Sequence, residues 1–457
     1  MLAPTAKPPK TFTATRNACK LCTPLGACLA FAGVAGSRTI LHGSQGCSTY
    51  IRRYMISHFK EPVDIASTSF SESTAVFGGR DNLRLGLDNV TRQYQPQVIG
   101  VATTCLAETI GEDVGMYLRE IQAECGDIAG GHPPVVHVAT PSYRGTHADG
   151  FHATVRALVE QLAEPGPRGE QINVFTPMVS PADLRYVKEI LADFELPSTV
   201  LPDYSDTLDA PTWEEYQLIP HGGTPLRAIR AAGQARASVE FSDVCDPQAT
   251  AGTFLAEAFA VPQRRLGMPI GVARSDALFD VLQEISGRPL PLKHAHERGR
   301  LIDALVDGHK YVFGKRAVVY GEEDLVIGMA AFLSEIGVVP VVCASGGDSG
   351  RLSQALSGVT AQAGGKIEVR SGADFAELEE MLPALQPDLL IGNSKGYSIA
   401  RKLGIPLVRA GFPIHDRIGG ARLLHVGYRG AQQLFDRVAN ALIAAVQDES
   451  QVGYMYM

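Results

Sequence analysis

The sequence predicts an α/β chain of three Rossmann-like domains, in which parallel β-sheets are flanked by helices. Short apolar runs that suit buried strands alternate along the chain with segments whose apolar residues recur at helical spacing. Repeated β-α-β units of this kind form parallel sheets with right-handed crossovers. A chain of 457 residues is also too long for one hydrophobic core, and its 47 glycines, beside only 7% aromatic residues, suit the tight turns of such units.

The first predicted domain covers residues 16–169 and follows an N-terminal arm, residues 1–15, that we expect to be flexible. Strands are predicted at residues 39–42, 97–103 and 133–138, and helices at 50–59, 80–94 and 111–124. The strand at 97–103 ends just before Cys105, at the edge where open α/β sheets place their ligands. The strand at 133–138 leads in the same way to Ser142.

The second domain, residues 170–296, follows a linker at Glu164–Gly169 that is rich in Pro and Gly. Strands are predicted at 171–175 and 198–201, and a helix opens with Ser180 as N-cap and Pro181 at its first position. A helix that starts at Glu297 leads into the third domain, residues 297–457. There the patterns predict strands at 316–320, 338–343, 388–392 and 406–409, with helices at 325–336 and 398–403.

The charge and the distribution of apolar residues argue against nucleic acid and membranes as partners and against secretion. The net charge of −8 argues against nucleic acid or an anionic membrane as a partner. No apolar run reaches the ~18 residues of a transmembrane helix, and the N-terminus has no hydrophobic segment of a signal peptide. We therefore expect a cytoplasmic protein, in which eight cysteines are thiols or metal ligands rather than a disulfide framework. Without a Gly-x-Gly-x-x-Gly turn between strand and helix, we expect no nucleotide site in this chain.

Cys22, Cys47 and Cys105 lie in three separate loops that contain Gly or Thr, 25 and 58 residues apart. Glycine accepts backbone angles that other residues avoid, so such loops allow thiolates to converge on one point. A single cysteine is commonly a small buried hydrophobe, but three in loops favour ligands, and thiolates are the ligands of iron–sulfur clusters. The spacing does not identify the metal by itself, although zinc sites usually show closely spaced cysteine pairs.

The motifs around these cysteines carry a family resemblance. They are Cys22-Thr-Pro-Leu-Gly-Ala, His42-Gly-Ser-Gln-Gly-Cys47, Ala75-Val-Phe-Gly-Gly79 and Thr103-Thr-Cys-Leu-Ala-Glu-Thr-Ile-Gly-Glu-Asp113. With these motifs the chain resembles the β-type subunit of nitrogenase component 1 and its nitrogenase-like relatives. The segments Pro387–Ser394 and Gly411–Arg417 extend the resemblance over nearly the whole chain, which implies the nitrogenase component 1 fold.

The resemblance implies a P-cluster-like [8Fe-7S] iron–sulfur cluster shared between an α-type and a β-type subunit. Cys22, Cys47 and Cys105 match its thiolate ligands on the β side, and Ser142 matches a redox-dependent serine ligand. For Ser142 a buried capping role is the alternative, because its interval from Cys105 differs from the family's by a residue or two. The active-site iron–sulfur cofactor is held by the α-type partner in this family, so we assign no catalytic residue here.

Two aromatic residues match positions involved in electron transfer and partner docking. Tyr50 matches an aromatic residue between the cluster and the partner's cofactor, and Phe77 matches an exposed aromatic residue that docks the ATP-dependent Fe-protein-type reductase. Packing in the core is the alternative for both. Cys19, which forms a Cys-x-x-Cys pair with Cys22, departs from the family's pattern and is interpreted as a structural thiol rather than a spare ligand or redox partner. The remaining cysteines are interpreted as non-ligands: Cys28, Cys125, Cys245 and Cys343.

The resemblance implies an electron-transferring β-type subunit of a nitrogenase-like reductase, within an α2β2 heterotetramer. Electrons would pass from the ATP-dependent reductase to the cluster and on to the partner's cofactor. One alternative is a non-enzymatic scaffold for cofactor assembly, but scaffold chains commonly lack the cysteine at the Cys105 position. A protochlorophyllide or chlorin reductase subunit is another alternative, and its cluster uses a different ligand set.

The segment Asn17-Ala-Cys-Lys-Leu-Cys22 is similar to nitrogenase-like methylthio-alkane reductases, which cleave the C–S bond of small thioethers. We therefore expect methylthio-alkanes as the substrate, with reduction of dinitrogen as the alternative. The Cys22-Thr-Pro-Leu-Gly and His42-Gly-Ser-Gln-Gly motifs differ from the Cys-Gln-Pro-Ala-Gly and His-Gly-Gly-Gln-Gly forms expected in vanadium and iron-only enzymes.

Overall fold

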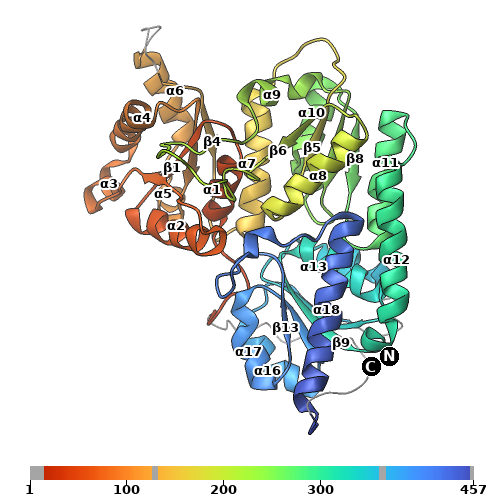
Figure 1. Cartoon of the computed structure of the whole chain (residues 1–457). Coiled ribbons are helices and arrows are strands. Elements are labelled where there is room, and N and C mark those ends of the chain that lie inside the picture. Colours follow the sequence, from red (N-terminus) through yellow and green to blue (C-terminus); the bar gives the residue numbers. More distant parts are fainter. Residues whose placement is uncertain (1–14, 126–131, 360–366, 453–457) are drawn as a thin grey trace, which may run out of the picture.

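The computed structural model describes residues 15–125, 132–359 and 367–452 (Figure 1). Within these residues the chain forms three entirely parallel sheets, each flanked by helices, which confirms the predicted fold class. Of the arm predicted at residues 1–15, all but Thr15 lies outside the described residues. The boundaries at residues 169 and 296 stay predictions. In the described parts of the chain, no helix combines the length and apolarity needed to cross a membrane.

The first sheet has the strand order β2-β1-β3-β4. Its strands are β1 (Ser37–His42), β2 (Ile65–Ser67), β3 (Val98–Thr103) and β4 (Val135–Val138), and its helices are α1 (Thr23–Ala32), α2 (Gln45–Phe59), α3 (Glu72–Phe77), α4 (Arg80–Tyr94), α5 (Cys105–Ile110), α6 (Val114–Cys125) and α7 (His147–Leu162). Every residue of β1 and β3 is buried, as expected for parallel strands covered on both faces. His42 pairs with Thr103 and Ala102 with Val138, so the three strands end at one edge.

Helices α1 and α7 cross in backbone contact. A Cβ atom on Gly26 of α1 would lie 1.7 Å from the His147 carbonyl oxygen, and one on Gly150 of α7 would lie 2.0 Å from the Thr23 carbonyl oxygen. Only glycine allows two helices to approach this closely. The crossing therefore fixes the start of α1, and with it Cys22, against the first sheet.

The second sheet has the order β6-β5-β7-β8. Its strands are β5 (Ile172–Phe175), β6 (Ser198–Leu201), β7 (Ala237–Phe241) and β8 (Gln263–Leu266), and its helices are α8 (Pro181–Asp193), α9 (Leu226–Arg230), α10 (Ala251–Phe259) and α11 (Val272–Ser286). Ser180 caps α8 as predicted. Its Oγ accepts the Asp183 N–H at 2.9 Å, and the Asp183 carboxylate accepts the Ser180 N–H at 3.1 Å, which completes a capping box.

The third sheet has the order β11-β10-β9-β12-β13. Its strands are β9 (Arg316–Gly321), β10 (Val339–Ser345), β11 (Glu368–Arg370), β12 (Leu389–Gly392) and β13 (Leu407–Arg409). Its helices are α12 (Leu292–Val312), α13 (Glu323–Glu335), α14 (Leu352–Ala355), α16 (Phe375–Leu385), α17 (Tyr397–Leu403) and α18 (Gly427–Glu449). Short 3₁₀ helices lie at η1 (Ala231–Gln234), η2 (Pro247–Ala249), η3 (Ser394–Gly396) and η4 (Gly420–Arg422).

The long helices α12 and α18 lie side by side along one flank of the molecule (Figure 1). The prediction that α12 starts at Glu297 was wrong, because the helix begins at Leu292 directly after Pro291. Proline lacks an N–H and fits the unbonded start of a helix, but it supplies no polar cap that marks the start in the sequence. A Cβ atom on Gly308 of α12 would lie 2.4 Å from the Phe435 ring of α18, which shows how tightly the two helices pack.

Candidate metal centre

The loops that carry Cys47 and Cys105 leave the same edge of the first sheet and touch each other. His42 ends β1 and Thr103 ends β3, and the two residues are direct partners in the sheet. The Thr104 N–H donates to the His42 carbonyl oxygen at 3.0 Å. A Cβ atom on Gly43 would lie 1.9 Å from Thr104 Oγ1, so the glycine of the His-Gly-Ser-Gln-Gly motif is required for this contact.

Two further segments complete the site. Cys22 is the N-cap residue of α1, and the neighbouring Thr23 Oγ1 donates to the Pro141 carbonyl oxygen at 3.4 Å. The loop after β4 is held in turn by Thr140, whose N–H donates to Thr103 Oγ1 at 2.8 Å. The segments that carry Cys22, Cys47, Cys105 and Ser142 therefore meet at one edge of the sheet, as the motifs predict.

The three cysteines lie near the surface of this chain rather than in its core. Cys22 is exposed, and Cys47 and Cys105 are half-buried. The alternative that they are small buried hydrophobes is therefore not supported for any of the three. Cys22 is the N-cap residue of α1, and Cys47 lies in the first turn of α2.

The three sulfur atoms are close enough to interact electrostatically. Desolvation by the surrounding protein raises the pKa of the Cys22 thiol to about 11, and the neighbouring charges of Cys47 and Cys105 contribute to this rise. Three thiolates at one place repel one another unless a cation lies between them. The donor set therefore fits a metal centre with several soft cations, and the exposure of Cys22 leaves it open to a second subunit.

Ser142 contacts Cys105 through its backbone. Its N–H donates to Cys105 Sγ at 3.2 Å, and the residue is half-buried. A hydrogen bond from an amide to a ligating sulfur tunes the potential of an iron–sulfur centre. The structure thus brings Ser142 to the site, while the role of its hydroxyl as a ligand stays a prediction.

Both aromatic residues proposed for electron transfer and docking lie on the surface. Tyr50 on α2 is 64% exposed, and Phe77 at the end of α3 is 88% exposed beside Val76, which is also exposed. The alternative that Tyr50 and Phe77 pack in the core of this chain is therefore wrong.

A buried pair that sequence analysis did not single out joins the Cys47 loop to the segment after Phe77. His42 Nε2 lies 3.1 Å from Glu112 Oε2, and both Glu112 oxygens lie 3.0 Å from the Gly79 N–H, which donates to them. Burial lowers the pKa of His42, although the Glu112 carboxylate opposes this effect. Glu112 is the residue before Asp113 in the Cys105 motif, so its position in that motif was the available signal.

The role of the other described cysteines as non-ligands stays a prediction, and of these Cys28 in α1 is close enough to Cys22 and Cys47 for their charges to help raise the pKa of its buried thiol. Cys19 is buried in a hydrophobic cluster with Tyr320 and Phe375, its N–H donates to the Ala373 carbonyl oxygen at 3.0 Å, and burial raises the pKa of its thiol to about 12. It therefore behaves as a structural thiol. Cys28 and Cys343 are buried, Cys245 is half-buried in a different region, and the side chain of Cys125 lies outside what the structure describes.

Comparison with known proteins places the chain in a family. Residues 22–443 match the family described as nitrogenase component 1 type oxidoreductase. The chain is 35% identical over 437 residues to the nitrogenase molybdenum-iron protein beta chain of Clostridium pasteurianum, covering 95% of this chain and 94% of the relative. It is also 35% identical over 436 residues to the nitrogenase vanadium-iron protein beta chain of Trichormus variabilis, covering 93% of each.

The solved structure of nitrogenase Cp1 at pH 6.5 superimposes on this chain with a TM-score of 0.94 at 33% identity, covering 99% of this chain and 98% of that one. The fold and the sequence therefore define an oxidoreductase subunit, and the chain belongs to the nitrogenase component 1 type oxidoreductase family. Within the family it stands with the β-type subunits, since the relatives named above are beta chains.

Proposed function

We propose that this chain is the electron-transferring β-type subunit of a nitrogenase-like reductase and holds one side of an iron–sulfur cluster at the interface with an α-type partner. The convergence of Cys22, Cys47 and Cys105 at one edge of the first sheet supports this proposal most directly. When bound, such a cluster accepts and passes on electrons one at a time.

The residues of this chain would hold the cluster and shape its surroundings. The three thiolates supply the bonds on the β side, and a P-cluster-like [8Fe-7S] centre is the type that the family resemblance implies. The Ser142 N–H, which already donates to Cys105 Sγ at 3.2 Å, would stabilise negative charge on that sulfur. The contacts of Gly43 with Thr104 and of Gly26 with His147 would keep the ligands in place while the charge of the centre changes.

The exposed aromatic residues fit contacts with two partners. Tyr50 lies three residues after Cys47 on α2 and is exposed, so an α-type chain that covers the cysteines would also cover Tyr50. Phe77 and Val76 form an exposed apolar pair on α3, and a projecting aromatic side chain of this kind is a natural anchor for the ATP-dependent Fe-protein-type reductase. The assembly we propose is an α2β2 heterotetramer in the cytoplasm.

For the substrate we propose small methylthio-alkanes, whose C–S bond would be reduced at the partner's iron–sulfur cofactor. The support is the Asn17–Cys22 segment. Reduction of dinitrogen is the second candidate, and it is favoured by the names of the relatives, which are beta chains of molybdenum-iron and vanadium-iron nitrogenases. A scaffold for cofactor assembly is disfavoured because Cys105 is present and lies beside the other two cysteines.

The deciding experiment is to purify the chain with its α-type partner and to measure iron, molybdenum and vanadium together with the EPR spectrum. Many irons in two types of cluster, with reduction of either substrate, would support a reductase. Absence of molybdenum and vanadium, with release of a thiol from a methylthio-alkane, would support the thioether reaction, whereas ammonia production would establish the dinitrogen reaction. A low iron content with a transferable cofactor would overturn the reductase proposal in favour of a scaffold.

A further inference from the structure

A cavity of about 300 Å³ lies where segments of all three sheets approach one another. Its lining comes from α7, the loop after β7, the start of α13 and the loop after β10. Cys22, Cys47, Cys105 and Ser142 are not among the residues that line it. The proposed cluster ligands therefore do not belong to this cavity, although Cys19, three residues before Cys22, is part of its wall.

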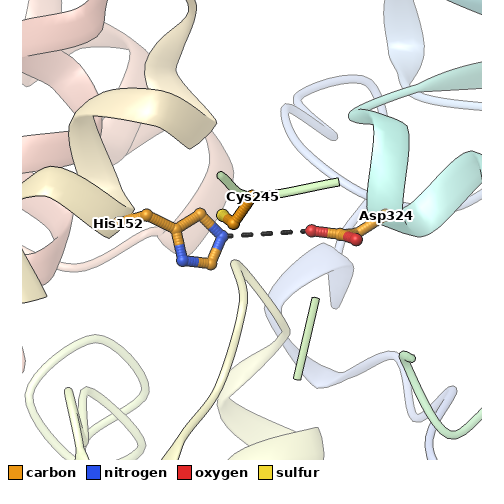
Figure 2. Close-up of side chains that lie close together, drawn as sticks. All are labelled: His152, Cys245 and Asp324. Atoms are coloured by element: carbon orange, nitrogen blue, oxygen red, sulfur yellow. Dashed lines mark ion pairs between the residues drawn. The ribbon is translucent and has the colours of Figure 1, made fainter. Parts of the chain in front are cut away.

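Three side chains with metal-binding atoms meet in the wall of this cavity (Figure 2). His152 comes from α7, Cys245 from the loop between β7 and η2, and Asp324 from the first turn of α13. One nitrogen, one sulfur and one oxygen atom of these residues all lie within 4.8 Å of one another, and His152 Nε2 is 4.0 Å from Asp324 Oδ2. Donors bound to one tetrahedral zinc lie roughly 3.5 Å apart, so small side-chain rotations would complete the site.

Surrounding groups hold the donors in this arrangement. Ser242 Oγ donates to Asp324 Oδ2 at 2.9 Å and accepts the Cys245 N–H at 2.8 Å. The Asp243 N–H donates to Asp324 Oδ1 at 2.6 Å, and Arg265 Nε donates to the Ser242 carbonyl oxygen at 2.9 Å. Such outer partners orient the ligands of metal sites and are often as important as the ligands themselves.

Anionic donors predominate at this place. The Cys245 sulfur and the Asp324 carboxylate both approach the His152 ring, and His152 Nε2 lies 4.0 Å from Asp324 Oδ2. Asp243 is paired with Arg274 at 2.7 Å, which leaves the Cys245 thiol and the Asp324 carboxyl as the groups that a bound cation would compensate.

We propose that His152, Cys245 and Asp324 bind one divalent transition metal ion of the zinc class in this cavity. One thiolate, one imidazole and one carboxylate suit zinc and similar borderline cations, and the two anionic ligands would neutralise its charge. The open cavity leaves space for water or a small molecule at the fourth position. The ion would also join α7, the β7 loop and α13, and this role does not depend on the function proposed above.

The test uses the complex with its α-type partner, produced in zinc-supplemented medium and desalted. We expect one zinc per chain, and zinc K-edge X-ray absorption, which iron does not mask, should show one sulfur neighbour at about 2.3 Å. The variants Cys245→Ser and His152→Gln should each lower bound zinc at least tenfold. Asp246→Asn is the matched control, because Asp246 lines the same cavity next to Cys245 without belonging to the donor set.

Three results would overturn the proposal. The first is a wild-type complex that retains no zinc, and the second is undiminished zinc in Cys245→Ser or His152→Gln. The third is zinc with three sulfur neighbours, which would place the ion on the cluster cysteines instead. Iron content and circular dichroism show whether each variant complex has assembled, and the wild-type absorption spectrum decides the question even if a variant does not fold.

Discussion

His42 Nε2 lies 3.1 Å from Glu112 Oε2, and this contact joins the end of β1 to the loop after α5, 70 residues further along the sequence. Both side chains are almost fully buried. Because Glu112 also accepts the Gly79 N–H, one carboxylate connects the loop that carries Cys47 to the segment that follows the exposed Phe77. The proposed docking surface and the proposed cluster loop are thus linked by two consecutive contacts, Gly79 to Glu112 and Glu112 to His42.

Replacing Glu112 with alanine should destabilise the complex. The Glu112→Ala variant leaves the Gly79 N–H and the His42 ring without their buried partner, which costs about 1–3 kcal/mol for an unsatisfied buried group. Thermal or urea denaturation would measure the loss. Glu120→Ala is the control, since Glu120 is exposed and pairs with Arg80 at the surface. Equal stability of the two variants would contradict a structural role for the link.

The cluster assignment predicts the behaviour of cysteine variants. Cys47→Ala and Cys105→Ala should lower the iron content of the complex and reduce electron transfer at least about tenfold, because each removes a thiolate ligand. Cys343→Ala is the matched control, since Cys343 is fully buried in β10 and away from the site. Full iron content and full activity in Cys47→Ala or Cys105→Ala would show that the ligand assignment is wrong.

The docking role of Phe77 predicts a change in binding without a change in stability. Phe77 is 88% exposed, so Phe77→Ala should leave the melting temperature and iron content unchanged. Loss of an anchor residue typically costs at least about 2 kcal/mol, or about thirtyfold in the dissociation constant for the reductase. Titration of electron transfer against reductase concentration measures this constant. An equal effect from Phe313→Ala, an exposed phenylalanine near α12, would make the change nonspecific.

Two glycine-to-alanine substitutions in helices should change stability in opposite directions, because, of the two, only Gly26 lies at the crossing of α1 and α7. In Gly26→Ala the new methyl group would lie 1.7 Å from a backbone oxygen of α7, so α1 must shift and stability should fall by about 3 kcal/mol. Iron content should fall with it, because α1 carries Cys22 at its start. Gly299→Ala in α12 meets no atom within 4 Å and should instead stabilise by about 0.4–1 kcal/mol. Denaturation midpoints and iron analysis distinguish the two.

Burial of His58 predicts a dependence of stability on pH. Its Nδ1 accepts the Ile414 N–H at 2.9 Å, and burial lowers the pKa of His58 to about 3. In the unfolded chain histidine titrates near pH 6.5, so the unfolded state binds the proton first. The contribution of neutral His58 is therefore complete above about pH 6.5 and decreases as the pH falls toward 3, by up to about 1.4 kcal/mol per unit.

The variant His58→Asn retains an acceptor for the Ile414 N–H but does not titrate. Its stability should therefore depend less on pH between about 6.5 and 4 than that of the wild type, as melting temperatures across this range would show. Identical pH profiles for the two proteins would rule out His58 as the source.

Local patterns predicted much of the fold. Helix α4 begins at Arg80 and ends at Tyr94 as predicted, because Leu83, Leu87 and Val90 recur on one buried face. The start of α12 was missed because Pro291 supplies no polar cap. No helix was predicted at residues 427–449, where α18 begins at Gly427 and the N-cap residue Val426 supplies no side-chain hydrogen bond.

The candidate sites, too, could be predicted from the sequence only in part. The cysteine loops could be predicted because each carries its own motif, but their convergence depends on the pairing of His42 with Thr103, which no spacing specifies. The set of His152, Cys245 and Asp324 could not be predicted, since its members lie on segments beside three different sheets and follow no local pattern. Cys245 was interpreted as a non-ligand for this reason, and the proposed zinc-class site assigns it a new role.

The burial of Cys19 has a mechanical consequence. Cys19 is anchored against the third sheet, while Cys22 opens α1 beside the first. The three Cα–Cα steps from Cys19 to Cys22 can span at most about 11 Å when fully extended. If the third sheet and its helices rotated relative to the first, this short segment would soon be fully extended and would pull on Cys22. A large movement of the first sheet relative to the third would therefore displace Cys22, the proposed cluster ligand, and change the geometry of the metal centre.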